Sequence, residues 1–170
     1  TVISEGTPYE ITTFRQDIET DGRRATIQYA DSLKSDATRR DFTMNALYAD
    51  ASGKIYDPLN GLADLKAGYL RFIENAERRI TEDYLRILRF FRFSAWYADP
   101  DLGFDPDALA AIATQGDGLL GLSKERITKE LLKLLAAPSP APLRGFTRFF
   151  VCEVAVLVGL CKFSPTRLVR

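Results

Sequence analysis

The chain has 170 residues, 46% of them hydrophobic, which is enough for one globular domain or two small ones. Lysine plus arginine and aspartate plus glutamate each number 23, so no global positive field attracts nucleic acid, and any RNA contact has to come from a local patch. The absence of histidine excludes Ser-His and Cys-His nucleophile systems and imidazole metal sites. Metal chemistry, if present, should therefore use a hard cation such as Mg²⁺ on oxygen ligands.

Residues 1–73 are predicted to be rich in β-strands, with one short helix, because short apolar runs alternate with Gly, Pro and Asp turns. In chain order the prediction is a hairpin of strands 2–4 and 9–14, a mobile charged loop at 17–24, a strand at 25–30, a second hairpin of strands 46–48 and 54–56, and a strand at 69–73.

From about residue 76 the apolar residues recur at helical spacing. Thr81, followed by Glu82 and Asp83, predicts a helix start with a capping hydroxyl and acids in the first turn, and this helix should run to Tyr97. Asp105-Pro106 predicts a second helix. A third is predicted over 124–137 after a Ser cap, with an i,i+4 pair of Arg126 and Glu130. The boundary between the mixed and the helical part falls near residue 74.

The segment from Glu82 to Phe93 places charged residues in an apolar helix. Positions 82, 86, 89 and 93 share one stripe, and Asp83 lies beside Arg86 at i+3. Arg donors and an Asp acceptor at fixed separation can meet the Watson–Crick edge of a base. A surface ion-pair ladder, at about 0.3–0.5 kcal/mol per pair, would explain a lone EDxxR. Here apolar residues occupy much of the remaining circumference, so the stripe is predicted to line something polar.

Two further motifs precede this helix. Residues 39–41, Arg-Arg-Asp, place two cations next to one acid before an apolar stretch, and a salt-bridged helix start is the alternative interpretation. Residues 57–65 carry Asp57, Gly61 and Asp64, which also fit a turn with a helix cap.

The order of these three motifs, 39–47, 57–65 and 82–93, resembles the bacterial tRNA nucleotidyltransferase and poly(A) polymerase family over about Tyr9 to Pro140. That family adds nucleotides to RNA 3′ ends without a template strand. The resemblance implies an α+β fold, in which an incomplete nucleotidyltransferase head with β-strands (1–73) joins an α-helical neck that binds RNA and nucleotides (74–140). Residues 141–170 would form a diverged or truncated C-terminal segment.

The resemblance also assigns roles to residues of this chain. Glu82, Asp83 and Arg86 resemble a protein template that selects CTP and ATP. Arg40 and Asp41 resemble a ribose-sensing pair. Asn45, Arg89 and, more weakly, Arg92 resemble phosphate contacts, while Asp57, Gly61 and Asp64 resemble the hinge between head and neck.

The metal site is the part that the resemblance leaves incomplete. Glu10 matches a third, weaker carboxylate of that site, although an exposed strand Glu explains it equally well. The family's Gly-Gly-x-x-Arg loop and Asp-x-Asp ligands would precede Thr1, and the chain does not begin with Met, so we expect a fragment. The Mg²⁺ of the complete enzyme would then have no complete site here, and the chain alone should be inactive.

The predicted function is CCA addition to tRNA 3′ ends, with CTP, ATP and tRNA as partners. The stretch 12–15, with Asp17 and the turn 21–23, resembles the start of a flexible loop and favours CCA addition. A poly(A) polymerase of the same family and a non-catalytic RNA- or nucleotide-binding module are the alternatives. No signal peptide is visible, the apolar run 149–160 is shorter than the ~20 residues of a membrane span, and Cys152 and Cys161 form no metal or disulfide motif, so a cytoplasmic protein is expected.

Overall fold

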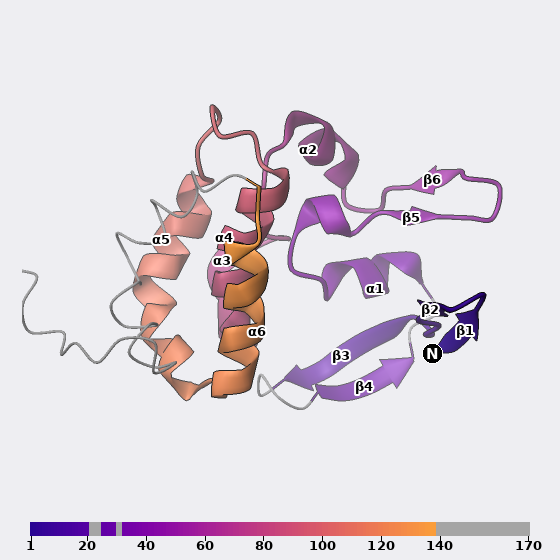
Figure 1. Ribbon diagram of the computed structural model, residues 1–170, viewed down its shortest axis with the longest axis horizontal. Helices are drawn as coiled ribbons and strands as arrows, with labels where there is room; N and C mark the ends of the chain where they lie inside the picture. Colours follow the sequence, from indigo (N-terminus) through magenta and orange to yellow (C-terminus); the bar gives the residue numbers. More distant parts are fainter. Residues whose placement is uncertain (21–24, 30–31, 139–170) are drawn as a thin grey trace, which may run out of the picture.

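The computed structural model describes residues 1–20, 25–29 and 32–138, which form small hairpins and a block of helices (Figure 1). The strands are β1 (Val2–Ser4), β2 (Thr7–Tyr9), β3 (Arg15–Thr20), β4 (Ala25–Tyr29), β5 (Tyr48–Ala49) and β6 (Ile55–Tyr56). The helices are α1 (Leu33–Thr38), α2 (Gly61–Ala67), α3 (Ala76–Glu82), α4 (Leu85–Tyr97), α5 (Pro106–Gln115) and α6 (Lys124–Leu135), with 3₁₀ turns η1 (Thr43–Asn45) and η2 (Gly116–Gly121).

The first two hairpins differ from the prediction in their boundaries. β1 pairs with β2 across a two-residue turn at Glu5 and Gly6, whose φ angles of 50° and 77° suit the twist of a tight hairpin. The second strand is therefore Thr7–Tyr9 and not 9–14. The predicted loop at 17–24 is wrong for residues 17–20, which lie in β3 paired with β4. Residues 21–24 fall outside the described part of the chain.

The third hairpin confirms the turn signal at residues 52–53, because β5 and β6 pair antiparallel there. Its first strand begins at Tyr48, since Ala46 closes the η1 turn by donating its N–H to the Thr43 carbonyl. The predicted strand at 69–73 is reduced to a single bridge between Phe42 and Phe72. The short helix of this part is α1, capped by Ser32, whose hydroxyl accepts the Ser35 N–H at 3.1 Å.

The predicted helix from Thr81 to Tyr97 is two helices. Thr81 lies inside α3, and its hydroxyl donates to the Arg78 carbonyl at 3.0 Å instead of capping. The chain becomes extended at Asp83, where φ is −157°, and α4 then runs to Tyr97 as predicted. Asp83 Oδ1 accepts the Leu85 N–H at 3.1 Å, so the carboxylate satisfies one free donor of the new helix.

The second and third predicted helices are confirmed as α5 and α6. Asp105 caps α5 through the Ala108 N–H at 3.0 Å, with Pro106 at the first helical position. α6 begins at Lys124, but Ser123 makes no side-chain cap hydrogen bond, and the helix ends at Leu135.

One aromatic core joins the helices to the loop before them. Phe42 and Phe72 have ring centroids 5.0 Å apart, and Phe72 stacks on Phe90 of α4 at 5.6 Å. The same cluster contains buried residues of α3, α5 and α6. Segments 42–44 and 70–72 of the predicted head therefore pack with the helices of the predicted neck, while every residue of β1 and β2 is exposed. The fold is α+β, as predicted.

Candidate functional site

A buried carboxylate, Asp36, organises the first part of the candidate site. It is 3% exposed and accepts hydrogen bonds from Arg39 Nε at 2.8 Å, Arg40 Nη2 at 3.3 Å and the Tyr48 hydroxyl at 2.8 Å. Burial raises the pKa of Asp36, but the hydrogen bonds from Tyr48 and Arg39 outweigh burial and leave it below its ordinary value. Burial and the bond to Asp36 raise the pKa of Tyr48 to about 12. The Arg40 guanidinium, 5.0 Å from the Tyr48 ring centre, is thereby fixed.

Asp41 is the centre of the second part. It is 4% exposed, and its Oδ1 accepts the Asn45 side-chain amide at 2.6 Å, while its Oδ2 accepts Arg89 Nε from α4. Burial raises the pKa of Asp41, yet the Arg89 hydrogen bond and charge outweigh it and lower the pKa overall. The structure thus brings together three residues that the sequence separates by up to 48 positions.

Arg86 lies in the third part and contacts both α3 and the end of α1. Its Nη1 donates to Glu82 Oε2 at 2.8 Å and to the Arg79 carbonyl at 2.9 Å, and its Nη2 donates to the Arg39 carbonyl at 3.0 Å. The other oxygen of Glu82 accepts Arg79 Nη2. Glu82 and Arg86, which the sequence places on one stripe, form an i,i+4 ion pair, the contact of the alternative interpretation, although the helix is interrupted between them.

The Asp83 side chain does not pair with Arg86, although one continuous helix would place the two residues side by side at i,i+3. Because the chain is extended at Asp83, its Oδ2 turns to α6 and accepts Arg126 Nη2 at 2.8 Å. This also corrects the predicted pair of Arg126 and Glu130. Glu130 accepts instead from Arg92 Nε at 2.6 Å and Lys133 Nζ at 3.0 Å. Arg92, the weaker phosphate candidate, is therefore engaged in a buried ion pair.

Burial raises the pKa of Glu130, but the bonds from Lys133 and Arg92 lower it more. The side chains of Arg92 and Glu130 are 12% and 6% exposed, so this pair joins α4 to α6 inside the protein.

The predicted hinge residues form a closely packed turn. Asp57 accepts the Gly61 and Leu62 N–H groups at 2.8 and 2.9 Å and so caps α2. A Cβ on Gly61 would lie 1.9 Å from the Thr43 carbonyl oxygen, so only glycine fits there. Asp64 accepts the Thr43 hydroxyl at 2.5 Å and Arg71 Nε at 2.7 Å.

The described residues do not fit a magnesium site. Among the described residues, no three carboxylate or cysteine side chains lie close enough to hold a metal ion, and Glu10 is exposed just after β2. The Asp-x-Asp spacing does occur, at 99–101 and at 105–107. In both places the first Asp caps a turn or helix, because Asp99 accepts the Asp101 N–H and Asp105 accepts that of Ala108. Also within the described ranges, no helix is long and apolar enough to cross a membrane.

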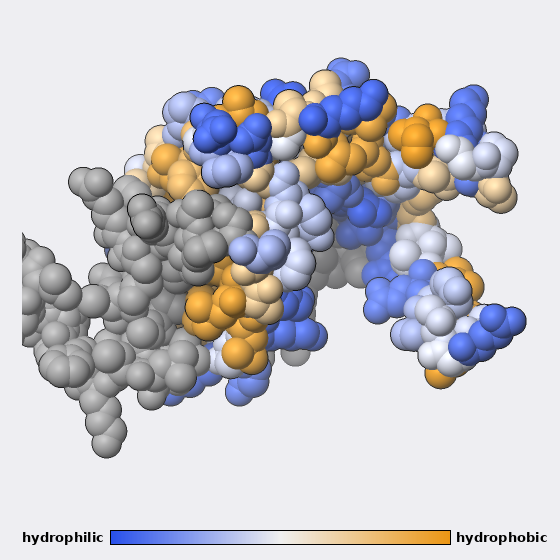
Figure 2. Space-filling model, turned by 45° about the horizontal axis from the view of Figure 1, so that its top comes forward, coloured by the Kyte–Doolittle hydropathy of each residue, from blue (hydrophilic) through white to orange (hydrophobic). Residues whose placement is uncertain are grey.

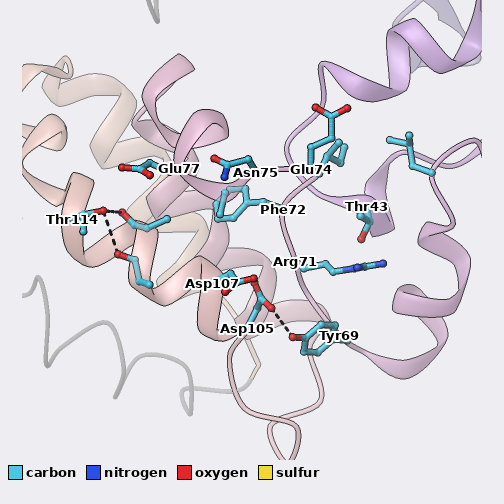
Figure 3. A pocket seen from close by; sticks show the side chains of 15 residues that line it. Thr43, Tyr69, Arg71, Phe72, Glu74, Asn75, Glu77, Asp105, Asp107 and Thr114 are labelled. Atoms are coloured by element: carbon cyan, nitrogen blue, oxygen red, sulfur yellow. Dashed lines mark hydrogen bonds between the residues drawn. The ribbon is translucent and has the colours of Figure 1, made fainter.

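A cavity of about 740 Å³ lies between the 69–77 segment and α5 (Figure 3). None of the predicted nucleotide-binding residues lines it. Its carboxylates are Glu74, Glu77, Asp105 and Asp107, against the single cation Arg71, which pairs with Asp64. Such a lining disfavours phosphate groups. The lining therefore favours the arginine network over this cavity as the candidate nucleotide site.

One face of the molecule is hollowed, and Figure 2 shows hydrophilic residues in a recess beside its main body. Sequence reasoning missed two residues that organise the arginine network, Asp36 and Arg79. Arg79 carries a local signal, since Glu82 follows it at i+3, whereas the contacts of Asp36 with Tyr48 depend on the fold.

Comparison with known proteins identifies the family and the fold of this chain. Residues 1–71 match the family model described as "Poly A polymerase head domain", and residues 101–146 match "Probable RNA and SrmB- binding site of polymerase A". The chain is 46% identical over 127 residues to the mitochondrial CCA tRNA nucleotidyltransferase 1 of Homo sapiens, covering 75% of this chain and 29% of that protein.

Two solved structures share the fold. One is the Bacillus stearothermophilus CCA-adding enzyme in complex with CTP, at 38% identity and a TM-score of 0.69, covering 81% of this chain and 32% of that chain. The other is the Thermotoga maritima CCA-adding enzyme complexed with tRNA_CCA, at 26% identity and a TM-score of 0.61, covering 78% and 32%. The chain spans about a third of the length of these proteins.

The fold is that of a nucleotidyltransferase head continued by a helical neck. The chain belongs to the tRNA nucleotidyltransferase and poly(A) polymerase family.

Proposed function

We propose that the protein to which this chain belongs adds CCA to tRNA 3′ ends, and that this chain supplies the groups that select the nucleotide. Residues 1–73 form the head portion and 74–140 the neck, with the selecting groups at their junction. The observation that carries the proposal is the position of Arg86. It is half-buried, joins α3, α4 and the end of α1, and belongs to a network rich in arginine.

Arg86 has a side-chain donor without a partner among the described residues. Three hydrogen bonds engage its two terminal nitrogens, and among the described residues none accepts from its Nε–H. This Nε is not one of the buried unpartnered nitrogens, in contrast to the Nε atoms of Arg40 and Arg79. Arg86 can therefore offer its Nε–H to a bound base while the rest of its guanidinium is held in place.

Asp83 can supply the matching acceptor. Its two oxygens each accept one hydrogen bond, from the Leu85 N–H and from Arg126, and a carboxylate has about four lone-pair positions. Cytosine and adenine both present an amino donor beside an unprotonated ring nitrogen. An Asp acceptor and an Arg donor complement that pair, whereas uracil and guanine present a carbonyl and an N–H and leave both groups unpaired.

The second part of the network, around Asp41, is proposed to bind the sugar and the phosphates of the nucleotide. Arg40 and Asp41 are proposed to sense the ribose, and Asn45 and Arg89 to contact phosphate. Arg40 Nε and Asn45 Oδ1 are buried polar atoms without a partner among the described residues. Such atoms are uncommon in native proteins and suit a site that a ligand completes.

The test measures nucleotide binding by the 170-residue chain. The wild-type chain should bind CTP and ATP more tightly than UTP and GTP. In Arg86→Ala or Asp83→Ala this preference should fall about 5- to 150-fold, the equivalent of 1–3 kcal/mol for one base-edge contact. Arg78→Ala is the control, because this arginine also contacts the Glu82 carboxylate, at 3.4 Å, but 68% of its side chain is exposed. Unchanged preference in both variants would sink the assignment of the template.

A further inference from the structure

The carbonyl groups at the end of α1 are contacted by two arginines from the neck. Arg79 Nη1 donates to the Thr38 carbonyl at 2.6 Å, and Arg86 Nη2 donates to the next carbonyl, that of Arg39, at 3.0 Å. Cations at the C-terminal end of a helix meet its unsatisfied carbonyls. The chain then continues directly into Arg40 and Asp41, so these two contacts join the ribose-sensing segment to the base-reading residue.

The nearly complete burial of Arg79 needs a physical explanation. It is 4% exposed, which is rare for arginine, and its Nε is buried without a partner among the described residues. Burial lowers the pKa of its guanidinium, which remains charged because arginine titrates far above neutral pH. A buried ion pair of this kind contributes little to stability compared with an apolar replacement.

The contacts of Arg79 converge on Arg86. Its Nη2 donates to Glu82, the opposite oxygen of which accepts from Arg86, and its own carbonyl accepts a second bond from Arg86 at 2.9 Å. Arg79 thus holds the Arg86 guanidinium in two ways, through Glu82 with its side chain and directly with its backbone carbonyl. Among the described residues, only Arg79 and Arg86 contact both the end of α1 and the Glu82 carboxylate.

We propose that Arg79 is a positioning residue that holds the base-reading Arg86 and the ribose-sensing segment 40–41 in one fixed geometry. The inference rests on the proposed function. Its distinctive consequence is that a change at Arg79 weakens base selection and sugar selection together.

The experiment compares Arg79→Lys with Arg78→Lys in the 170-residue chain. Lysine keeps the charge, but its single ammonium cannot span the Thr38 carbonyl and Glu82 as the planar fork does. The CTP:UTP and CTP:dCTP affinity ratios should each fall about fivefold or more in Arg79→Lys, as expected when a base or hydroxyl contact is lost. Both ratios should remain unchanged in Arg78→Lys.

The outcomes are separable. If wild type shows no CTP:UTP preference, the proposed function fails, and the inference fails with it. If wild type discriminates and Arg79→Lys keeps both ratios with only a lower melting temperature, Arg79 is structural and the inference is overturned.

A measurement on the wild-type chain covers the case in which Arg79→Lys does not fold. CTP titration followed by the arginine Nε–H NMR signals should shift those of Arg86 and Arg79 and leave Arg78 unmoved. A response of Arg86 without one of Arg79 would contradict the inference.

Discussion

At the scale of single residues, three carboxylates of the site pair with arginines that come from another part of the chain. Asp41 pairs with Arg89, Asp83 with Arg126 and Glu130 with Arg92, at separations of 38 to 48 residues. Removing one member of a buried pair leaves the other charged and desolvated. A substitution in this network therefore acts on stability as well as on any ligand.

Asp41 allows the two effects to be measured apart. Asp41→Asn keeps the shape but removes the charge that faces Arg89, and we expect a loss of about 2–4 kcal/mol in the free energy of unfolding. Urea denaturation measures this loss, with Asp101→Asn, at an exposed position, as the control. Where the variant is folded, its CTP:dCTP affinity ratio should also fall. A folded variant that keeps the wild-type ratio would remove Asp41 from the ribose-sensing pair.

The pKa shifts predict how stability changes with pH. The pKa values of Asp36, Asp41 and Glu130 are lowered in the folded chain, so each contributes stability that is present above its unfolded pKa and lost as pH falls through the folded value. We expect the melting temperature to drop steeply below about pH 4. The pKa of Tyr48 is raised to about 12, so its contribution is full below pH 10 and lost as pH rises towards 12. A melting temperature that stays flat from pH 6 to pH 3 would contradict the carboxylate assignments.

At the scale of elements, the sequence predicts helices and turns that local chemistry determines. The Asp105-Pro106 start of α5 and the hairpin turn at residues 52–53 are of this kind, and both are confirmed. The break between α3 and α4 is not determined by local chemistry, because it depends on a residue far along the chain. A Cβ on Gly118 would lie 2.0 Å from the Tyr84 ring, so Tyr84 packs on the η2 backbone, and the chain leaves the helix at Asp83 just before it.

The same distinction explains which parts of the site could be predicted. Residues 82 and 86 lie four apart, and their contact survives the break. The partners of Asp83 and Glu130 could not be read from helical spacing, because both turn to groups on other helices. The charged composition of 17–24 indicated a loop, whereas pairing with β4 keeps residues 17–20 in a strand.

Gly61 gives a test of the turn before α2. In Gly61→Ala the new methyl group would overlap the Thr43 carbonyl, at 1.9 Å, so the turn must shift, and we expect a loss of about 1–3 kcal/mol or more. Gly121→Ala is the matched control, because a Cβ there meets no atom within 4 Å. Thermal unfolding of both variants decides the point. Equal melting temperatures would mean that the α2 turn moves freely, as a hinge would.

At the scale of the whole molecule, acidic and basic residues are equal in number but gather in different places. The charged residues that line the cavity beside α5 are mostly carboxylates, whereas arginines gather where α1, α3 and α4 meet. The aromatic core extends from the helices to segments 42–44 and 70–72, so the groups proposed to read sugar and base rest on one packed unit. Nucleotide binding can therefore be a property of this chain by itself.

Catalysis by this chain alone is a separate question, and we expect none. Phosphoryl transfer from a nucleoside triphosphate depends on metal ions held by several carboxylates, and the described residues contain no such group. The acids of the arginine network are already paired with arginines, and Glu10 is a single exposed carboxylate. The assay supplies radiolabelled CTP and a tRNA without its 3′ CCA, with Mg²⁺ or Mn²⁺, to the 170-residue chain freed of host enzyme. Binding of CTP without incorporation is the expected result, because holding the triphosphate with arginines does not activate the 3′ hydroxyl. Stoichiometric incorporation that Arg86→Ala abolishes would show that this chain does hold a complete set of metal ligands.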